Sequence, residues 1–184
     1  LLITGPNGGG KTSLLRTILR LQSPTKGRIS FFRQGEPVSS LDMGYLPQKN
    51  SIDSRFPITV EEVVASGLMG NTQKGNTKFD SKKEIDEMLD LMGITALRNK
   101  PIGVLSGGQL QRSLFGRALI SKPEMLILDE PASYIDRQFG NRMFEILRDL
   151  SSNGTTIMMV SHEIEPFITL SNRNLYINHI LGDR

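Results

Sequence analysis

The sequence predicts an α/β fold, in which a parallel sheet flanked by helices carries an inserted α-helical lobe. Two features indicate the sheet: short apolar runs alternate with amphipathic segments at both ends of the chain, and a glycine-rich loop joins the first run to the first helix. A third feature indicates the lobe, because about fifty consecutive residues show mainly helical spacing. We therefore expect one domain, residues 1–184, with an α/β core at 1–56 and 106–184 and a helical lobe at 57–105.

The predicted strands are short and apolar. The clearest is Met125–Leu128, which has no polar residue and lies between Pro123 and Asp129. Such a run is typical of a central parallel strand that is covered on both faces. In chain order, the expected strands are residues 1–4, 28–33, 43–46, 125–128, 155–160 and 174–181.

The predicted helices are recognised by apolar residues that recur every three or four positions. The first helix carries leucine or isoleucine at positions 14, 15, 18 and 19, and the last one ends at Asn153-Gly154. Within the lobe, residues 70–77 are polar and rich in glycine and asparagine, which predicts a mobile loop. The expected helices are residues 11–22, 60–69, 81–92, 107–120 and 139–150.

The composition excludes several classes of protein. The 184 residues contain no cysteine, which excludes disulfide scaffolds, cysteine-ligated zinc and thiol catalysis. No apolar run approaches the ~20 residues that a membrane-spanning helix needs. The net charge is +3 and no basic run is present, so we expect no nucleic-acid partner.

A phosphate-binding loop follows the first strand. The run from Gly5 to Thr12 fits the pattern G-x-x-x-x-G-K-[ST] and opens a helix, so its backbone N–H groups can converge on phosphate oxygens. Lys11, expected in an accessible loop, would reach the β- and γ-phosphates, and the Thr12 hydroxyl would bind Mg²⁺. The alternative is a glycine turn that matches the pattern by chance, but such a turn would not need to lie between a strand and a helix. The predicted nucleotide-binding residues here are Gly5, Pro6, Asn7, Gly8, Gly9, Gly10, Lys11, Thr12 and Ser13.

Two adjacent carboxylates end the apolar strand near residue 128. Asp129 and Glu130 are unfavourable at this place unless a cation lies nearby, and Mg²⁺ on a triphosphate would supply one. Asp129 would then contact the metal, and Glu130 would polarise the attacking water. The simpler alternative is a solvated strand end or a helix cap, with Pro131 starting a helix.

A second candidate anion site precedes the helix at residue 107. Ser106 is a good N-cap, and the glycines of Leu105–Gln109 expose backbone donors. One nucleotide does not need two such sites, and Gln111-Arg112 follow directly. The predicted ligand-binding residues of this motif are Ser106, Gly107, Gly108 and Gln109; the alternative is an ordinary flexible N-cap.

Together these motifs resemble the ATP-binding cassette (ABC) ATPases, the motor subunits of ABC transporters. The resemblance covers the whole chain in the right order. It implies that Leu105–Gln109 is the signature motif, which closes over the γ-phosphate bound to a second subunit. It also implies that Gln48 senses Mg²⁺ and contacts the membrane partner. Ser133–Asp136 occupies the D-loop position, and His162 matches the switch histidine that contacts the γ-phosphate.

The resemblance implies partners and a location. It implies ATP and Mg²⁺ as ligands, a head-to-tail homodimer with a second ATP-binding subunit, and a membrane permease at the cytoplasmic face of the cell membrane. The runs Tyr45–Gln48 and Phe56–Val64 are similar to those of the zinc and manganese uptake branch, and iron-chelate importers share much of this pattern. The family also has an antiparallel β segment before the glycine loop, with an aromatic residue that stacks on adenine; we expect that segment to be missing before Leu1.

Two other classes of function remain as alternatives. A soluble cassette protein of DNA repair, chromosome organisation or translation usually carries long coiled-coil insertions or a second cassette, and no heptad run occurs here. A P-loop GTPase would need an N-K-x-D motif, which Asn99–Ile102 fails at its fourth position. A small-molecule kinase would not need Leu105–Gln109. The sequence therefore favours the transporter ATPase.

Overall fold

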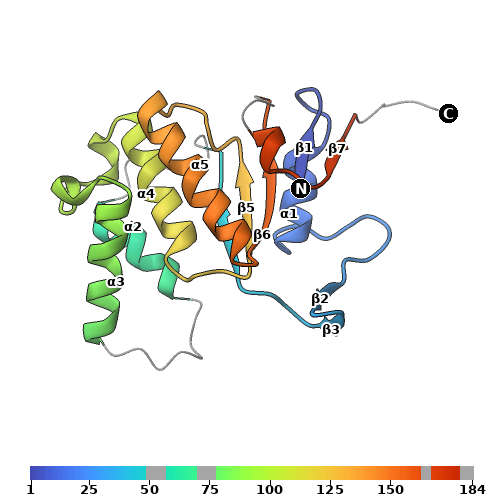
Figure 1. The fold of residues 1–184 in the computed structure, drawn as a ribbon, viewed down its shortest axis with the longest axis horizontal. Coiled ribbons are helices and arrows are strands. Elements are labelled where there is room, and N and C mark those ends of the chain that lie inside the picture. Colours follow the sequence, from blue (N-terminus) through green and yellow to red (C-terminus); the bar gives the residue numbers. More distant parts are fainter. Residues whose placement is uncertain (49–56, 70–77, 163–166, 179–184) are drawn as a thin grey trace.

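The fold is built around a five-stranded parallel sheet (Figure 1). The computed structural model describes residues 1–48, 57–69, 78–162 and 167–178. The strand order is β4-β5-β6-β1-β7. Every neighbouring pair is parallel, which confirms the predicted parallel-sheet core. The strands are β1 (Leu2–Thr4), β4 (Met43–Leu46), β5 (Met125–Asp129), β6 (Thr156–Val160) and β7 (Asn174–Tyr176).

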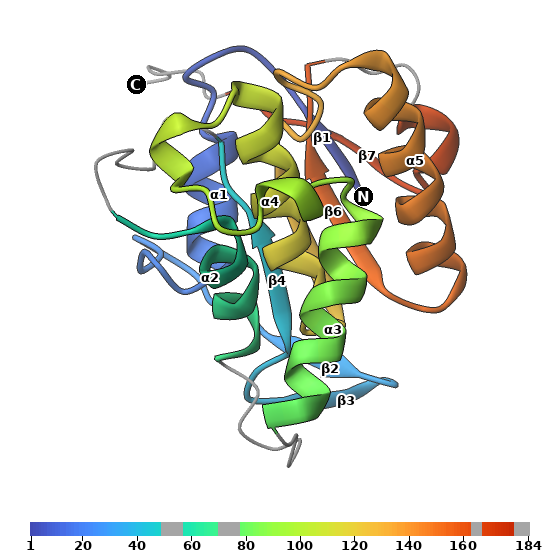
Figure 2. The same cartoon turned by 90° about the vertical axis from the view of Figure 1, so that its left-hand side faces the viewer.

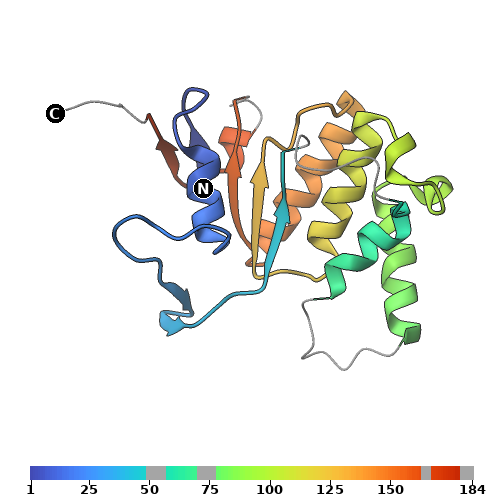
Figure 3. The ribbon, with the colours of Figure 1, turned by 180° about the vertical axis from the view of Figure 1, so that it is seen from behind.

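The two faces of the sheet pack against different helices. Along β5, Leu126 and Leu128 belong to one apolar cluster and Met125 and Ile127 to the other, as the two-residue period of a strand requires. Helix α1 (Lys11–Ile18) packs on the Ile127 face, while α4 (Gly107–Leu119) and α5 (Arg137–Ser152) pack on the other face. Figure 3 shows α1 and these two helices on opposite sides of the sheet.

A lobe of helices packs on the outer side of α4 (Figure 2). It contains α2 (Val60–Ala65), which continues as a 3-10 turn at Ser66–Leu68, and α3 (Lys78–Leu91). Two further 3-10 turns, Thr95–Leu97 and Ile102–Val104, lead to α4. The buried side chains of the lobe and of one sheet face form a single apolar cluster, because α4 contacts both. The boundaries at 57 and 105 therefore stay a prediction.

Two glycines allow α4 to approach its neighbours closely. A Cβ atom at Gly44 of β4 would lie 2.0 Å from the Ala118 carbonyl oxygen, and one at Gly67 would lie 2.2 Å from the Arg117 carbonyl oxygen. Real Cβ atoms do not reach such distances. Any larger residue at either position would therefore push α4 away from the sheet or from the lobe.

Several elements differ from the prediction. The segment expected as one strand at 28–33 is a hairpin, β2 (Phe31–Arg33) and β3 (Glu36–Val38), because Gln34 and Gly35 both adopt positive φ and close a two-residue turn. Helix α1 ends at Ile18 instead of residue 22, since Arg20 takes a left-handed φ of 58°. Helix α5 starts earlier than expected because the Asp136 carboxylate caps it. The loop predicted at 70–77 lies outside the described residues, as do residues 179–181 of the last predicted strand.

In the part of the chain that the structure describes, no helix combines the length and apolarity needed to cross a bilayer.

Candidate functional site

The glycine-rich loop curls around the ammonium group of Lys11. The loop leaves β1 at Gly5, and a Cβ atom there would lie 1.9 Å from the Ile177 carbonyl oxygen, so glycine is required. Gly10, with φ of 95°, turns the chain into α1. Lys11 Nζ donates hydrogen bonds of 2.9 Å to the carbonyl oxygens of Gly5 and Pro6. The expectation of an accessible Lys11 is therefore wrong: the residue is only 7% exposed, because it begins the helix and folds back beneath its own loop.

The loop forms one wall of a pocket of about 370 Å³ at the carboxyl edge of the sheet. Parallel strands end at this edge, which is where ligands bind in open α/β sheets. From the loop and α1, residues Asn7–Ser13 line the pocket. From the ends of β4, β5 and β6, the lining residues are Gln48, Asp129, Glu130, Val160 and His162.

Asp129 lies at the end of β5 in direct contact with the loop helix. It is 1% exposed, and its Oδ2 accepts a hydrogen bond of 3.0 Å from the Thr12 hydroxyl. Burial raises the pKa of the Asp129 carboxyl, and the Thr12 hydrogen bond and the charge of Lys11 oppose that rise. A buried carboxylate beside a hydroxyl is a suitable pair of oxygen ligands for a small divalent cation.

Glu130 is held in a conformation that only a minority of residues adopt. Its φ is 54°, and its backbone N–H donates to the Val160 carbonyl oxygen at 2.9 Å. Its Oε1 lies 3.3 Å from His162 Nε2, and the backbone N–H of His162 donates to Oε2 at 3.4 Å. Oε1 is buried, and within the described residues it accepts no hydrogen bond. One carboxylate oxygen thus lacks a hydrogen-bond donor among the described residues, and it has almost no accessible surface of its own.

The environment of Glu130 favours proton transfer. Burial raises the pKa of its carboxyl, and the neighbouring His162 opposes that rise. A carboxylate with a raised pKa is a better general base than an exposed one, because it holds an abstracted proton more firmly. Its place in the lining of the pocket and its raised pKa together suit Glu130 to activate water.

The structure brings most of the predicted site residues together. Gln48 is exposed at the end of β4 and lines the same pocket, and His162 follows β6 there. Gly5 and Pro6 begin the loop and hold Lys11. The sequence did not identify Val160, because its contribution is a backbone carbonyl that no side-chain pattern signals.

The second predicted anion site lies apart from this pocket. Residues Ser106–Gln109 do not line it; they form the N-terminus of α4. The Ser106 hydroxyl accepts from the backbone N–H of Gln109 at 3.3 Å, and the backbone N–H of Ser106 donates to Gln109 Oε1 at 3.0 Å. This capping box leaves Ser106 exposed, with Gly107 and Gly108 beside it. The motif is therefore preformed, but it does not share the pocket of Lys11.

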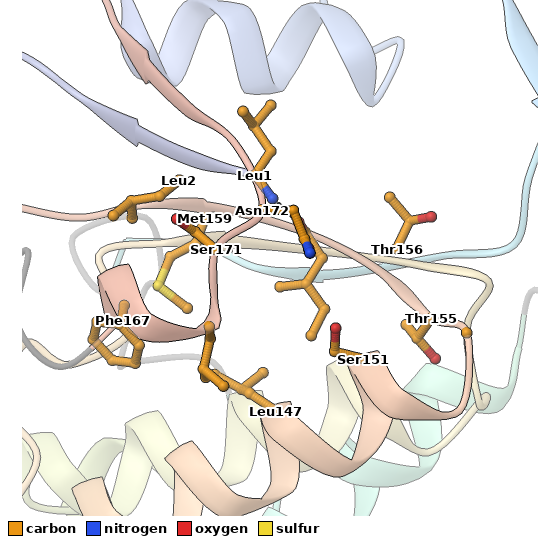
Figure 4. A pocket seen from close by; sticks show the side chains of 13 residues that line it. Leu1, Leu2, Leu147, Ser151, Thr155, Thr156, Met159, Phe167, Ser171 and Asn172 are labelled. Carbon is orange, nitrogen blue, oxygen red and sulfur yellow. Dashed lines mark hydrogen bonds between the residues drawn. The ribbon is translucent and has the colours of Figure 1, made fainter.

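Another pocket, of about 290 Å³, lies between β6, the end of α5 and the 3-10 helix Phe167–Leu170 (Figure 4). Leu147 and Ser151 come from α5, and Leu1 and Leu2 close the pocket on the strand side. Among the described residues that line it, none has a carboxylate, imidazole, lysine or arginine side chain. The pocket at Lys11 is therefore the candidate functional site.

Comparison with known proteins decides the family. The sequence model of the family described as ABC transporter matches residues 1–133. The chain belongs to the ABC transporter family. Membership confirms the resemblance drawn from the motifs, and it makes this chain an ATP-binding cassette with the ATPase activity of a transporter subunit.

Its relatives are ATP-binding subunits of metal transport systems. A Chlamydia pneumoniae protein named "Probable metal transport system ATP-binding protein" is 40% identical over 97% of this chain and 74% of that protein. The zinc uptake system ATP-binding protein ZurA of Listeria monocytogenes is 38% identical over 98% of this chain and 70% of that protein. Among solved structures, a dimeric ATP-binding cassette in a post-hydrolysis state with ADP and Pi superposes with a TM-score of 0.81. It is 25% identical, and the match covers 96% of this chain and 80% of that one.

Proposed function

We propose that this cassette hydrolyses ATP to drive the uptake of zinc, manganese or a similar divalent metal ion through a membrane permease. The observation that carries the ATPase chemistry is the meeting of Lys11, Asp129 and Glu130 around one pocket. The cargo is supported by the zinc and metal transport relatives, because the pocket itself is built for a nucleotide and not for the transported ion.

The residues of the pocket suit a magnesium ion. Mg²⁺ prefers hard oxygen ligands, and three side chains of the lining offer them: the Thr12 hydroxyl, the Asp129 carboxylate and the Gln48 amide. Asp129 is almost wholly buried, so a nearby cation would compensate for the cost of keeping its charge there. When bound, Mg²⁺ neutralises charge that develops on the β- and γ-phosphate oxygens.

The chain's own residues supply binding and proton transfer. The ammonium group of Lys11 would exchange the carbonyl oxygens of Gly5 and Pro6 for oxygens of the β- and γ-phosphates. Glu130 would accept a proton from water as the water oxygen bonds to the γ-phosphorus. The bond between that phosphorus and the oxygen shared with the β-phosphate then breaks, and ADP leaves with the electron pair. His162, beside Glu130, would donate a hydrogen bond to the γ-phosphate.

The separate position of Ser106 supports a second subunit. Its exposed hydroxyl and the backbone N–H groups of Gly107 and Gly108 would complete the site of a partner cassette in a head-to-tail homodimer. The related cassette in the post-hydrolysis state is dimeric. The lobe at 57–105 would contact the permease, since it exposes Met69 and Val104, which are 82% and 67% accessible. The cassette would then lie at the cytoplasmic face of the cell membrane.

Reconstitution tests this proposal. The full-length protein and its permease would be placed in liposomes, and ATP turnover and uptake of zinc, manganese and a ferric chelate would be measured in parallel. We expect ATP-dependent uptake of zinc or manganese, and loss of both activities in Lys11→Ala. Uptake of the ferric chelate alone would contradict the cargo. Normal turnover in Lys11→Ala would contradict the assignment of the nucleotide site.

A further inference from the structure

One face of α4 packs against the segment that follows Glu130. Gly108, Gln111 and Arg112 are spaced i, i+3 and i+4, so they lie on the same side of the helix. Each of them contacts residues 131–136, which join β5 to α5. Figures 1 and 3 show α4 and α5 side by side on this face of the sheet.

The contacts fix this segment along its length. A Cβ atom at position 108 would lie 2.9 Å from the Tyr134 carbonyl oxygen, so glycine lets the segment lie directly on the helix. Gln111 Nε2 donates to the Pro131 carbonyl oxygen at 3.3 Å. At the far end, Arg112 pairs with Asp136.

Of these three residues, Gln111 makes its contact closest to Glu130 in the sequence, because its hydrogen-bond partner, Pro131, directly follows Glu130. Glu130 has a left-handed backbone, which is unfavourable for a residue with a side chain and persists only when its surroundings impose it. Val160 holds the amide side of Glu130, and Gln111 holds the carbonyl of the next residue. The conformation of Glu130 is thus fixed from β6 and from α4.

The burial of Gln111 indicates that its amide is present for the hydrogen bond to Pro131 and not for packing alone. The residue is 1% exposed, yet in the described part of the chain its Oε1 accepts no hydrogen bond. A buried amide with an unpaired oxygen is unfavourable relative to an apolar side chain of the same size. A residue chosen for packing alone would therefore be apolar.

We infer that Gln111 is a positioning residue for Glu130: its hydrogen bond to Pro131 holds the Glu130 carboxylate in the orientation that activates water. The inference rests on the proposed role of Glu130 as the base. It also links two parts of the cassette, because Gln111 belongs to the helix that begins with Ser106. Movement of that helix would be transmitted to the position of the carboxylate.

The test is a double-mutant cycle on the full-length protein in complex with its permease. Gln111→Met keeps the length of the side chain and removes both the donor and the unpaired oxygen, so the fold should be retained. We expect kcat to fall by about 10- to 100-fold, as for a displaced catalytic group, with KM for ATP and ATP binding unchanged. In a Glu130→Gln background, the same substitution should have no further effect, because the group it positions is gone.

A matched control uses another polar residue of α4. Ser113 is fully buried, and its hydroxyl donates to the Gln109 carbonyl oxygen at 2.9 Å, on a different side of the helix from Gln111. Ser113→Ala should leave kcat within about twofold of the parent value, since the loss of a hydrogen bond within the helix does not move Glu130.

Several results would overturn the inference. An unchanged kcat in Gln111→Met would do so, and so would equal losses in the parent and Glu130→Gln backgrounds, which would mean that Gln111 acts independently. If Gln111→Met yields too little folded protein, Gln111→Leu provides the same comparison. If Glu130→Gln alone turned over ATP at the parental rate, the proposed role of Glu130 as the base would be wrong. That result is obtained without any change at position 111, so it is distinguishable from a failure of the inference on Gln111.

Discussion

Replacing Glu130 with glutamine should nearly stop hydrolysis while leaving ATP binding intact. The substitution keeps the shape of the side chain, and the backbone N–H of His162, 3.4 Å from Oε2, can donate to the new amide oxygen. The lost function is the ability to take a proton from water. Loss of a general base slows turnover by about 10²–10⁴-fold, which corresponds to ~2.7–5.4 kcal/mol of activation free energy.

The same substitution should change the pH dependence of stability. Burial raises the pKa of the Glu130 carboxyl above its ordinary value of 4.5, so the folded state retains this proton over an interval in which the unfolded chain has lost it. The contribution of Glu130 to the free energy of unfolding therefore falls as pH rises through that interval. Glutamine does not ionise. The stability of Glu130→Gln relative to the parent should thus increase as pH rises above 4.5.

Both effects can be measured on full-length proteins. ATP turnover and binding of a fluorescent ATP analogue would be compared in the permease complex, and denaturant unfolding would be followed on the isolated cassettes from acid to neutral pH. Turnover within about threefold of the parent would refute the role of base, because the expected loss is far larger. Loss of ATP binding would show instead that Glu130 is a ligand. A stability difference that is constant with pH would contradict the raised pKa.

Three further predictions follow from named contacts. Lys11→Ala should abolish turnover with little loss of secondary structure by circular dichroism, since α1 keeps its other packing residues; turnover near the parent value would contradict the phosphate contact. In a Glu130→Gln background, Ser106→Arg should abolish an ATP-dependent shift to dimer on a sizing column, because the larger side chain would occupy the place proposed for the partner's phosphate; a dimer indifferent to ATP and to this change would contradict the shared site. Gly44→Ala should destabilise the fold by about 1–3 kcal/mol through overpacking against Ala118, whereas Gly140→Ala, with open space around its Cβ, should stabilise α5 by up to ~1 kcal/mol in thermal unfolding; equal effects would contradict the close approach of α4.

The sequence predicted correctly those parts of the architecture that depend on one strong residue pattern. The apolar run at 125–128 predicted a buried strand, β5, which is an interior strand of the sheet although not its central one, and the loop Gly5–Thr12 predicted one wall of the pocket at Lys11. Burial on both faces and phosphate binding each restrict residue type severely. The hairpin at 31–38 was missed because its strands are short and largely exposed, so they carry little periodicity. The one feature of the sequence that indicates this hairpin is its turn, Gln34-Gly35, where both residues adopt positive φ.

The side chains that line the pocket could be predicted from the sequence, but the backbone contacts that position them could not. Adjacent carboxylates at a strand end identified Asp129 and Glu130, but the left-handed backbone of Glu130 has no sequence signature in a residue other than glycine. The accessibility of Lys11 was also predicted wrongly, because the sequence places a lysine after a loop without showing that the loop folds over it. Tertiary hydrogen bonds decide both features.

The two hydrogen bonds of Lys11 have a consequence for which ligands the cassette can accept. A free lysine side chain loses about 2 kcal/mol of conformational entropy when it is immobilised, but this one is already ordered by the carbonyl oxygens of Gly5 and Pro6. A nucleotide therefore meets a side chain whose ordering was completed during folding. To displace it from that position, the ligand must offer acceptors that replace both carbonyl oxygens. Phosphate oxygens meet this condition, so nucleotide binding exchanges one pair of acceptors for another and does not have to order a free side chain.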